Sequence, residues 1–242
     1  MRGFSTCVAL VAVLFAAGCG GGGGGGGGGG STGQASGEAA KPANTVVADA
    51  AKAATDASSF HMSGQIHSSG KLIGVDLSLL RGKGATGTVT VGGAKVDLVL
   101  IGNDGYLRAS SDFWQQYAGQ AGGPALVQML ADKWIKFPGK SAQLGSLTGP
   151  LSTKQLFNTL TTSHGKLENQ GETTYNGQSV VKIHDVTKSS TLYVAATGTP
   201  YPVGLVKTAG SDRGTVAFDH WNEPPTLAAP KGALDFSHLG SG

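Results

Sequence analysis

The 242-residue chain has only two cysteines, and both lie within its first 19 residues. Any folded part further along therefore has no disulfide and no reactive thiol, so its stability must come from its core alone. Basic residues are also sparse: 18 Lys and Arg are scattered singly among 15 Asp and Glu, for a net charge of +3. Without a basic patch the electrostatic footprint of a nucleic-acid-binding protein is missing. We expect no nucleic-acid partner.

Motifs of hydrolytic chemistry are absent as well. The serine of Gly145-Ser-Leu-Thr-Gly149 stands at the wrong position for the Gly-x-Ser-x-Gly turn of serine hydrolases. No pair of carboxylates is suggested, because Asp97 and Asp104 fit a solvent-facing strand and a turn. The sequence therefore predicts no catalytic residues, no enzyme activity and no cofactor.

The histidines give no predicted metal site. His61 and His67 share one face of a predicted strand, but six residues at about 3.3 Å each place them ~20 Å apart. His220 directly follows Asp219, and neighbours in a strand point to opposite faces. We interpret the histidines as structural or solvent-exposed and predict no bound metal.

The apolar run near the N-terminus has the form of an export signal. Arg2 precedes apolar residues 7–17, a stretch too short for the usual ~20-residue membrane span. Ala16-Ala17-Gly18-Cys19 resembles the lipobox of bacterial lipoproteins, although Ala16 stands where leucine is usual. The resemblance implies that residues 1–18 are a removed signal peptide and that Cys19 carries the lipid, anchoring the protein at the extracytoplasmic face of the cell membrane. The alternative is an ordinary secretory signal.

An unbroken glycine run occupies residues 20–30. It cannot be a phosphate-binding loop, which needs a preceding strand, a following helix and side chains at set spacings. We interpret residues 19–44 as the lipidated cysteine and a flexible tether, with a typical reach of roughly 25–30 Å. Residues 45–242 have the length of a single domain.

Period-two alternation and glycine-rich turns indicate that residues 45–242 are mainly β. Asn44 is expected to cap a first helix over residues 45–58, and residues 112–117 are expected to form a loop. Two more helices are predicted over residues 124–132 and 152–161. The predicted strands span residues 60–67, 73–79, 85–91, 94–101, 106–109, 134–137, 167–174, 179–185, 192–195, 201–208 and 214–221.

Several short motifs resemble the actinobacterial cell-envelope lipoproteins of the LppX and LprG type, related in shape to the LolA lipoprotein carriers. The motifs are residues 58–64 (SSFHMSG), 104–107 (DGYL) with Trp114, 175–178 (YNGQ), 192–194 (LYV) with 197–203 (TGTPYPV), and 216–224 (VAFDHWNEP). The resemblance implies an α+β fold that is mainly β: a curved antiparallel half-barrel of about 11 strands, with about three helices over its concave face. It also implies an apolar cavity for acyl chains of envelope lipids or lipoproteins.

Two functions therefore stay open: a lipid-anchored monomer that binds or carries an amphiphilic lipid or glycolipid, and a cell-envelope interaction module with a filled core. For the first, the alternation of the strands and the predicted helical stripes suggest a cavity lining. The candidate lining residues are Ile73, Val75, Leu77, Leu79, Val96, Leu98, Leu100, Trp114, Leu126, Met129, Leu130, Leu156, Phe157 and Leu160.

Overall fold

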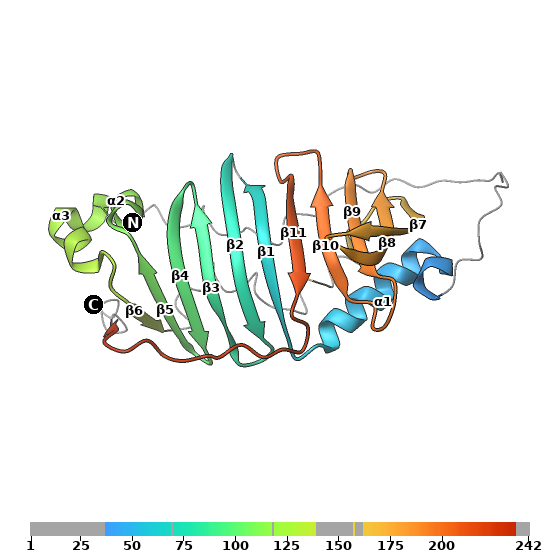
Figure 1. Ribbon diagram of the computed structural model, residues 1–242. Coiled ribbons are helices and arrows are strands. Elements are labelled where there is room, and N and C mark those ends of the chain that lie inside the picture. The colour runs from blue at the N-terminus through green and yellow to red at the C-terminus, as the bar shows by residue number, and fades with distance from the viewer. Residues whose placement is uncertain (1–36, 69, 118, 139–156, 158–161, 236–242) are drawn as a thin grey trace.

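The computed structural model describes residues 37–68, 70–117, 119–138, 157 and 162–235. Its described strands form one 12-stranded sheet (Figure 1). The strands are β1 (Ser59–Ser68), β2 (Lys71–Leu80), β3 (Gly84–Val91), β4 (Ala94–Ile101), β5 (Asp104–Ala109), β6 (Ile135–Pro138), β7 (Leu167–Tyr175), β8 (Gln178–Asp185), β9 (Ser190–Ala195), β10 (Pro202–Lys207), β11 (Gly214–Asp219) and β12 (Leu234–Asp235). The eleven strands expected from the sequence are present, and β12 is an addition.

The sheet consists of two antiparallel meanders, β1–β6 and β7–β11, joined where β1 pairs with β11. This junction places His61 opposite Asp219 and Met62 opposite Phe218. After β11 the chain runs back along the sheet to its other end (Figure 1), where β12 pairs parallel with β6. The strand order is therefore open, from β12 at one edge to β7 at the other.

The first helix, α1 (Ala43–Asp56), lies at the β7–β10 end of the sheet (Figure 1). Its buried side chains are all small, so the helix packs close to the strands: Val46, Val47, Ala50, Ala51 and Ala54. The expected cap was wrong, because Asn44 lies inside the helix and Pro42 holds the N-cap position without a side-chain hydrogen bond. A short 3₁₀ helix, η2 (Gly37–Ala40), precedes it.

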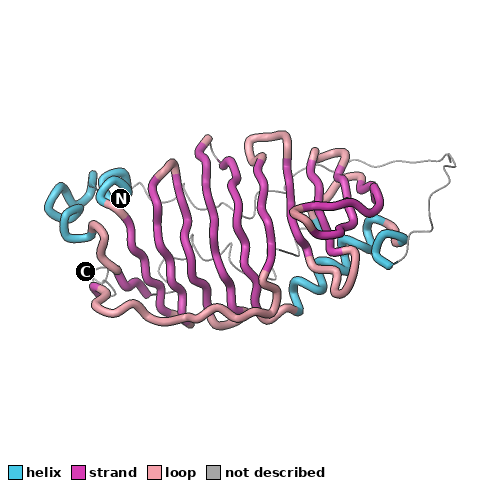
Figure 2. The backbone as a smooth tube through the Cα atoms, in the orientation of Figure 1, coloured by secondary structure: helices cyan, strands magenta, loops and turns pink. Residues whose placement is uncertain are grey.

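The opposite end of the sheet carries α2 (Ser111–Tyr117) and α3 (Gly119–Leu130), as the tube in Figure 2 also shows. The expected loop at residues 112–117 was wrong, since these residues form α2. α3 starts before the predicted residue 124 and is interrupted at Gly123, whose φ of 66° is not helical. Among the described residues, no helix is long and apolar enough to span a membrane. The predicted helix at 152–161 lies outside the described residues except for Phe157.

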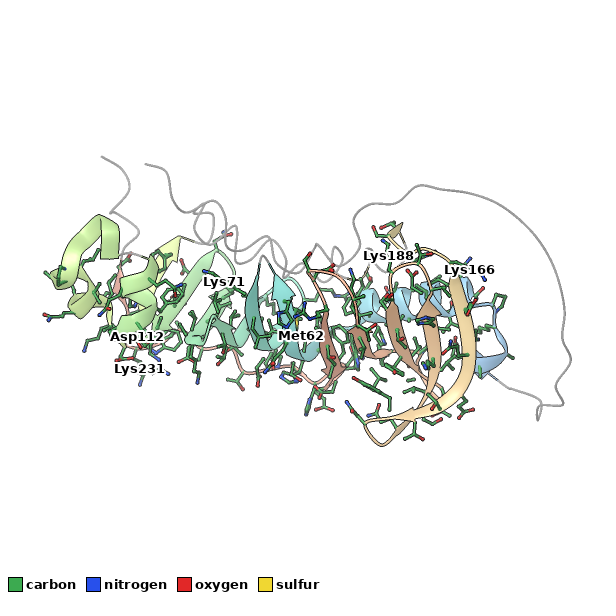
Figure 3. All side chains as sticks on the ribbon, turned by 90° about the horizontal axis from the view of Figure 1, so that it is seen from above. Met62, Lys71, Asp112, Lys166, Lys188 and Lys231 are labelled. Atoms are coloured by element: carbon green, nitrogen blue, oxygen red, sulfur yellow. The ribbon has the colours of Figure 1, made fainter. Side chains whose placement is uncertain are left out.

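The two faces of the sheet differ. The inner face is defined by Phe60 and Met62 of β1 and by Ile73, Val75, Leu77 and Leu79 of β2, which pack in one buried cluster with α1. The outer face carries the alternate residues, including His61 and Asp76. Figure 3 shows the molecule from above, with α1 to one side of the strands.

Candidate functional site

Most of the predicted lining residues lie together on the inner face. Leu98 joins the buried cluster of β2, and Leu100 packs against it. A second cluster under α2 and α3 contains Val96, Trp114 and Leu130, with Leu126 partly buried against it. Sequence alternation thus identified one apolar surface, but the structure divides it into two clusters that face different helices.

Among the described residues, one predicted lining residue belongs to neither cluster. Met129 is 49% exposed, whereas Val127 and Leu130 of the same helix are buried in the second cluster. Leu156 and Leu160 lie outside the described residues.

An aromatic cluster that sequence reasoning did not predict fills the inner face where β1 meets β11. Phe157 is 1% exposed, and its ring centroid lies 5.4 Å from those of Phe60 and Phe218. Trp221 stacks on Phe60 at 5.2 Å and on Tyr201 at 4.6 Å. Pairs at these distances add to the stability that burial alone provides. The cluster joins β1, β11 and a residue of the chain between β6 and β7.

A small pocket opens between α1 and strands β7–β10. It is lined by Val47, His164, Leu167, Ile183, Asp185, Ser190, Leu192 and Leu205. Its volume of about 20 Å³ is room for roughly one water molecule. Its acidic residue, Asp185, is 3% exposed and accepts hydrogen bonds from the backbone N–H groups of Gly165, Thr187 and Lys188. These backbone groups therefore supply hydrogen-bond donors to the buried Asp185 carboxylate.

The outer face holds a polar cluster at the β1–β11 junction. His61 bridges two carboxylates: its Nδ1 lies 2.6 Å from Asp219 Oδ1, and its Nε2 lies 3.0 Å from Asp76 Oδ1. Burial disfavours the charged imidazole, but the hydrogen bonds to Asp76 and Asp219 outweigh this effect and raise the pKa of His61. Burial also disfavours the charged carboxylate of Asp219, but the hydrogen bonds with His220 and His61 outweigh this effect. The pKa of Asp219 is therefore lowered.

The sequence argument that Asp219 and His220 point to opposite faces was wrong. His220 adopts a left-handed backbone with a φ of 50°, so the extended alternation stops after Asp219. Its Nδ1 consequently lies 2.8 Å from Asp219 Oδ1, and its ring contacts that of His61 with centroids 5.7 Å apart. Histidine adopts this conformation more often than most non-glycine residues, but too rarely for the sequence alone to predict the turn.

An open, curved, mainly antiparallel sheet with helices packed on its inner face defines the class of fold. No protein-family model matches the chain, and no curated protein sequence matches it. Among solved structures, LprF from Mycobacterium bovis is similar with a TM-score of 0.54 and 13% identity, over 78% of this chain and 96% of LprF. Mycobacterium tuberculosis lipoprotein LppX gives a TM-score of 0.49 and 16% identity, over 77% and 98%.

The match to LprF, at this low identity, establishes the fold. The LppX/LprG-like architecture expected from the sequence motifs is thereby confirmed: a mainly β fold with a curved, open sheet and helices on one side.

Proposed function

We propose that this protein is a membrane-anchored lipoprotein of the cell envelope that receives acyl chains of an amphiphilic lipid on its inner face. The observation that carries the proposal is the apolar surface of β1–β4, between the two described groups of helices. α1 packs on β7–β10 and α2 on β4, at opposite ends of the sheet (Figure 1). Between them, β1 and β2 supply Met62, Ile66, Ile73, Val75 and Leu77.

Partition of the acyl chain supplies the driving force in this proposal. These side chains are already buried. The favourable free energy of binding must therefore come from the ligand, at ~0.8 kcal/mol for each methylene that leaves water. Roughly ten methylenes would provide about 8 kcal/mol, which must exceed the cost of ordering the bound chain. The headgroup stays in solvent, and no covalent chemistry is required.

A bulky side chain on the inner face should block lipid uptake. We expect Val89→Trp in β3 to reduce the lipid-bound fraction about tenfold, because overfilling a packed apolar site costs ~1–3 kcal/mol. Val89 pairs with Val75 and Val96, so its side chain belongs to the inner face. The measurement is native mass spectrometry of the Cys19→Ser protein purified from its host, followed by titration with a fluorescent fatty acid.

Thr90→Trp is the matched control, because Thr90 is the next residue of the same strand and faces outward, paired with Gly74 and Lys95. It should retain lipid. Absence of lipid mass in the parent protein, together with no uptake of the offered fatty acid, would overturn the proposal and favour an interaction module with a filled core. An equal loss in both tryptophan variants would count against the inner face as the site.

Membrane attachment through Cys19 is a separate part of the proposal. Two or three acyl chains on one cysteine anchor a protein stably, whereas a single chain holds it only marginally. Cys19→Ala should therefore move the protein from the detergent phase to the aqueous phase in a Triton X-114 partition and abolish labelling by a palmitate analogue. Cys7→Ala, within the predicted signal peptide, should change neither result. Retention of the Cys19→Ala protein in membranes would show that another element anchors it.

A further inference from the structure

The polar cluster on the outer face has no part in the proposed lipid binding, yet it has the composition of a metal site. Two imidazoles and one carboxylate, from His61, His220 and Asp219, face one another on the outer face where β1 meets β11. Their ligand atoms all lie within 4.8 Å of one another.

The distances within the cluster are close to those around a bound ion. Zinc binds imidazole and carboxylate at about 2.0–2.2 Å, so neighbouring ligands of a tetrahedral ion are roughly 3.3–3.5 Å apart. The two nitrogens now lie 2.6 and 2.8 Å from the shared Asp219 oxygen. An ion at the centre requires these pairs to separate by roughly 0.5–0.9 Å. Asp219 and His220 can rotate, because their side chains are 47% and 61% exposed.

Asp76 orients one of the ligands. It accepts from His61 Nε2 at 3.0 Å, which leaves Nδ1 directed at the centre of the cluster. A histidine that binds a metal through one nitrogen commonly donates its other N–H to a carboxylate, and that bond settles both the tautomer and the ring orientation. The second carboxylate also increases the negative charge that attracts a cation.

Trp221 and Asn222, the two residues after His220, hold the turn at His220 in place through contacts with other parts of the fold. The His220 φ of 50° is left-handed, a conformation that only a few per cent of non-glycine residues adopt, histidine more often than most. Asn222, which is also left-handed, accepts from the Ser58 backbone N–H at 2.7 Å and donates to the Tyr201 hydroxyl at 2.6 Å. Trp221 lies between them, stacked on Tyr201. Such backbone strain persists only where the surroundings enforce it, and it concentrates at functional sites.

We propose that His61, Asp219 and His220 bind one divalent transition-metal ion of the zinc type, with Asp76 as a positioning residue. Imidazole ligands select Zn²⁺, Co²⁺ or Ni²⁺ over Mg²⁺ and Ca²⁺, which prefer oxygen. Three protein ligands leave a fourth position for water or for a group from a partner. The site lies on the face opposite the proposed lipid surface, so the outcome for one proposal does not decide the other.

The test is a Zn²⁺ titration of the full chain carrying Cys7→Ser and Cys19→Ser, so that no thiol competes for the ion. We expect one equivalent to bind, measured by calorimetry and by competition with a zinc indicator, and excess Mg²⁺ to leave it in place. Long-range ¹H–¹⁵N spectra should show His61 coordinated through Nδ1 and protonated at Nε2. Asp76→Asn should weaken binding about 10–100-fold, and His220→Ala by at least as much.

His67→Ala is the matched control, because His67 lies on the same strand and face as His61, about 20 Å along it. It should bind Zn²⁺ as the parent does. The proposal is overturned if the parent takes up no zinc, if His220→Ala binds as tightly as the parent, or if His67→Ala loses as much. Unchanged affinity in Asp76→Asn would remove the positioning role of that carboxylate.

Discussion

Replacing Gly87 by alanine is expected to lower the free energy of unfolding by at least about 2–3 kcal/mol. The reason is that a residue with a Cβ atom is strained at the positive φ that Gly87 adopts. Gly87 lies on the inner face of β3, between Leu77 and Leu98 on the neighbouring strands. Its φ is 146°, and a Cβ atom there would lie 2.1 Å from the Asp76 carbonyl oxygen. Backbone atoms of a central strand cannot move aside cheaply, so the strand pairing itself must shift.

The matched control is Gly74→Ala on the adjacent strand β2. A Cβ atom at Gly74 would meet Thr90 at 3.4 Å, which is an ordinary contact. We expect the change in stability to stay within about 0.5 kcal/mol. Urea denaturation followed by circular dichroism measures both. Equal midpoints for the two variants would show that the β2–β3 pairing tolerates a side chain at Gly87.

Truncating Phe60 to alanine is the second change with a large expected effect, a loss of about 3–5 kcal/mol. Phe60 is buried and packs against three other rings, with centroids at 5.4 Å for Phe157, 6.3 Å for Phe218 and 5.2 Å for Trp221. Removing it leaves a cavity and removes the ring contacts that join β1 to β11. The urea midpoint and the near-ultraviolet circular dichroism of the aromatic cluster provide the measurement.

Leu72→Ala tests whether any loss of a large apolar residue would do the same. Leu72 is 43% exposed on β2, so we expect a change within about 0.5 kcal/mol. If Phe60→Ala proves no more destabilising than Leu72→Ala, the aromatic cluster is not a main source of stability.

Local pattern was enough to predict most of the strands. β2 alternates buried residues with partly or fully exposed ones along most of its length, and that burial depends on which face each residue occupies. The turn at Asn176-Gly177 is equally local, since both residues adopt positive φ angles of 49° and 79°, the conformation of a tight hairpin turn. Period and turn chemistry are properties of a few neighbouring residues, so they can be read without knowing the fold.

Elements that depend on distant contacts were missed or misassigned. β12 has two residues and exists through its pairing with β6. The sequence predicts a loop where α2 forms, although Trp114 of α2 is buried with Val127 and Leu130 of the following helix. In both cases the deciding contacts come from residues that the local window does not contain.

The sequence by itself determined the strands, most of the turns, the apolar inner face and the resemblance to a lipoprotein fold, because alternation and turn residues act over a few positions. Only the tertiary structure decided which strands become neighbours. Pairing β1 with β11 brings His61 to Asp219, and the packing of Trp221 and Asn222 turns His220 toward the same side. Such a cluster depends on long-range pairing and on one left-handed residue, neither of which a local pattern encodes.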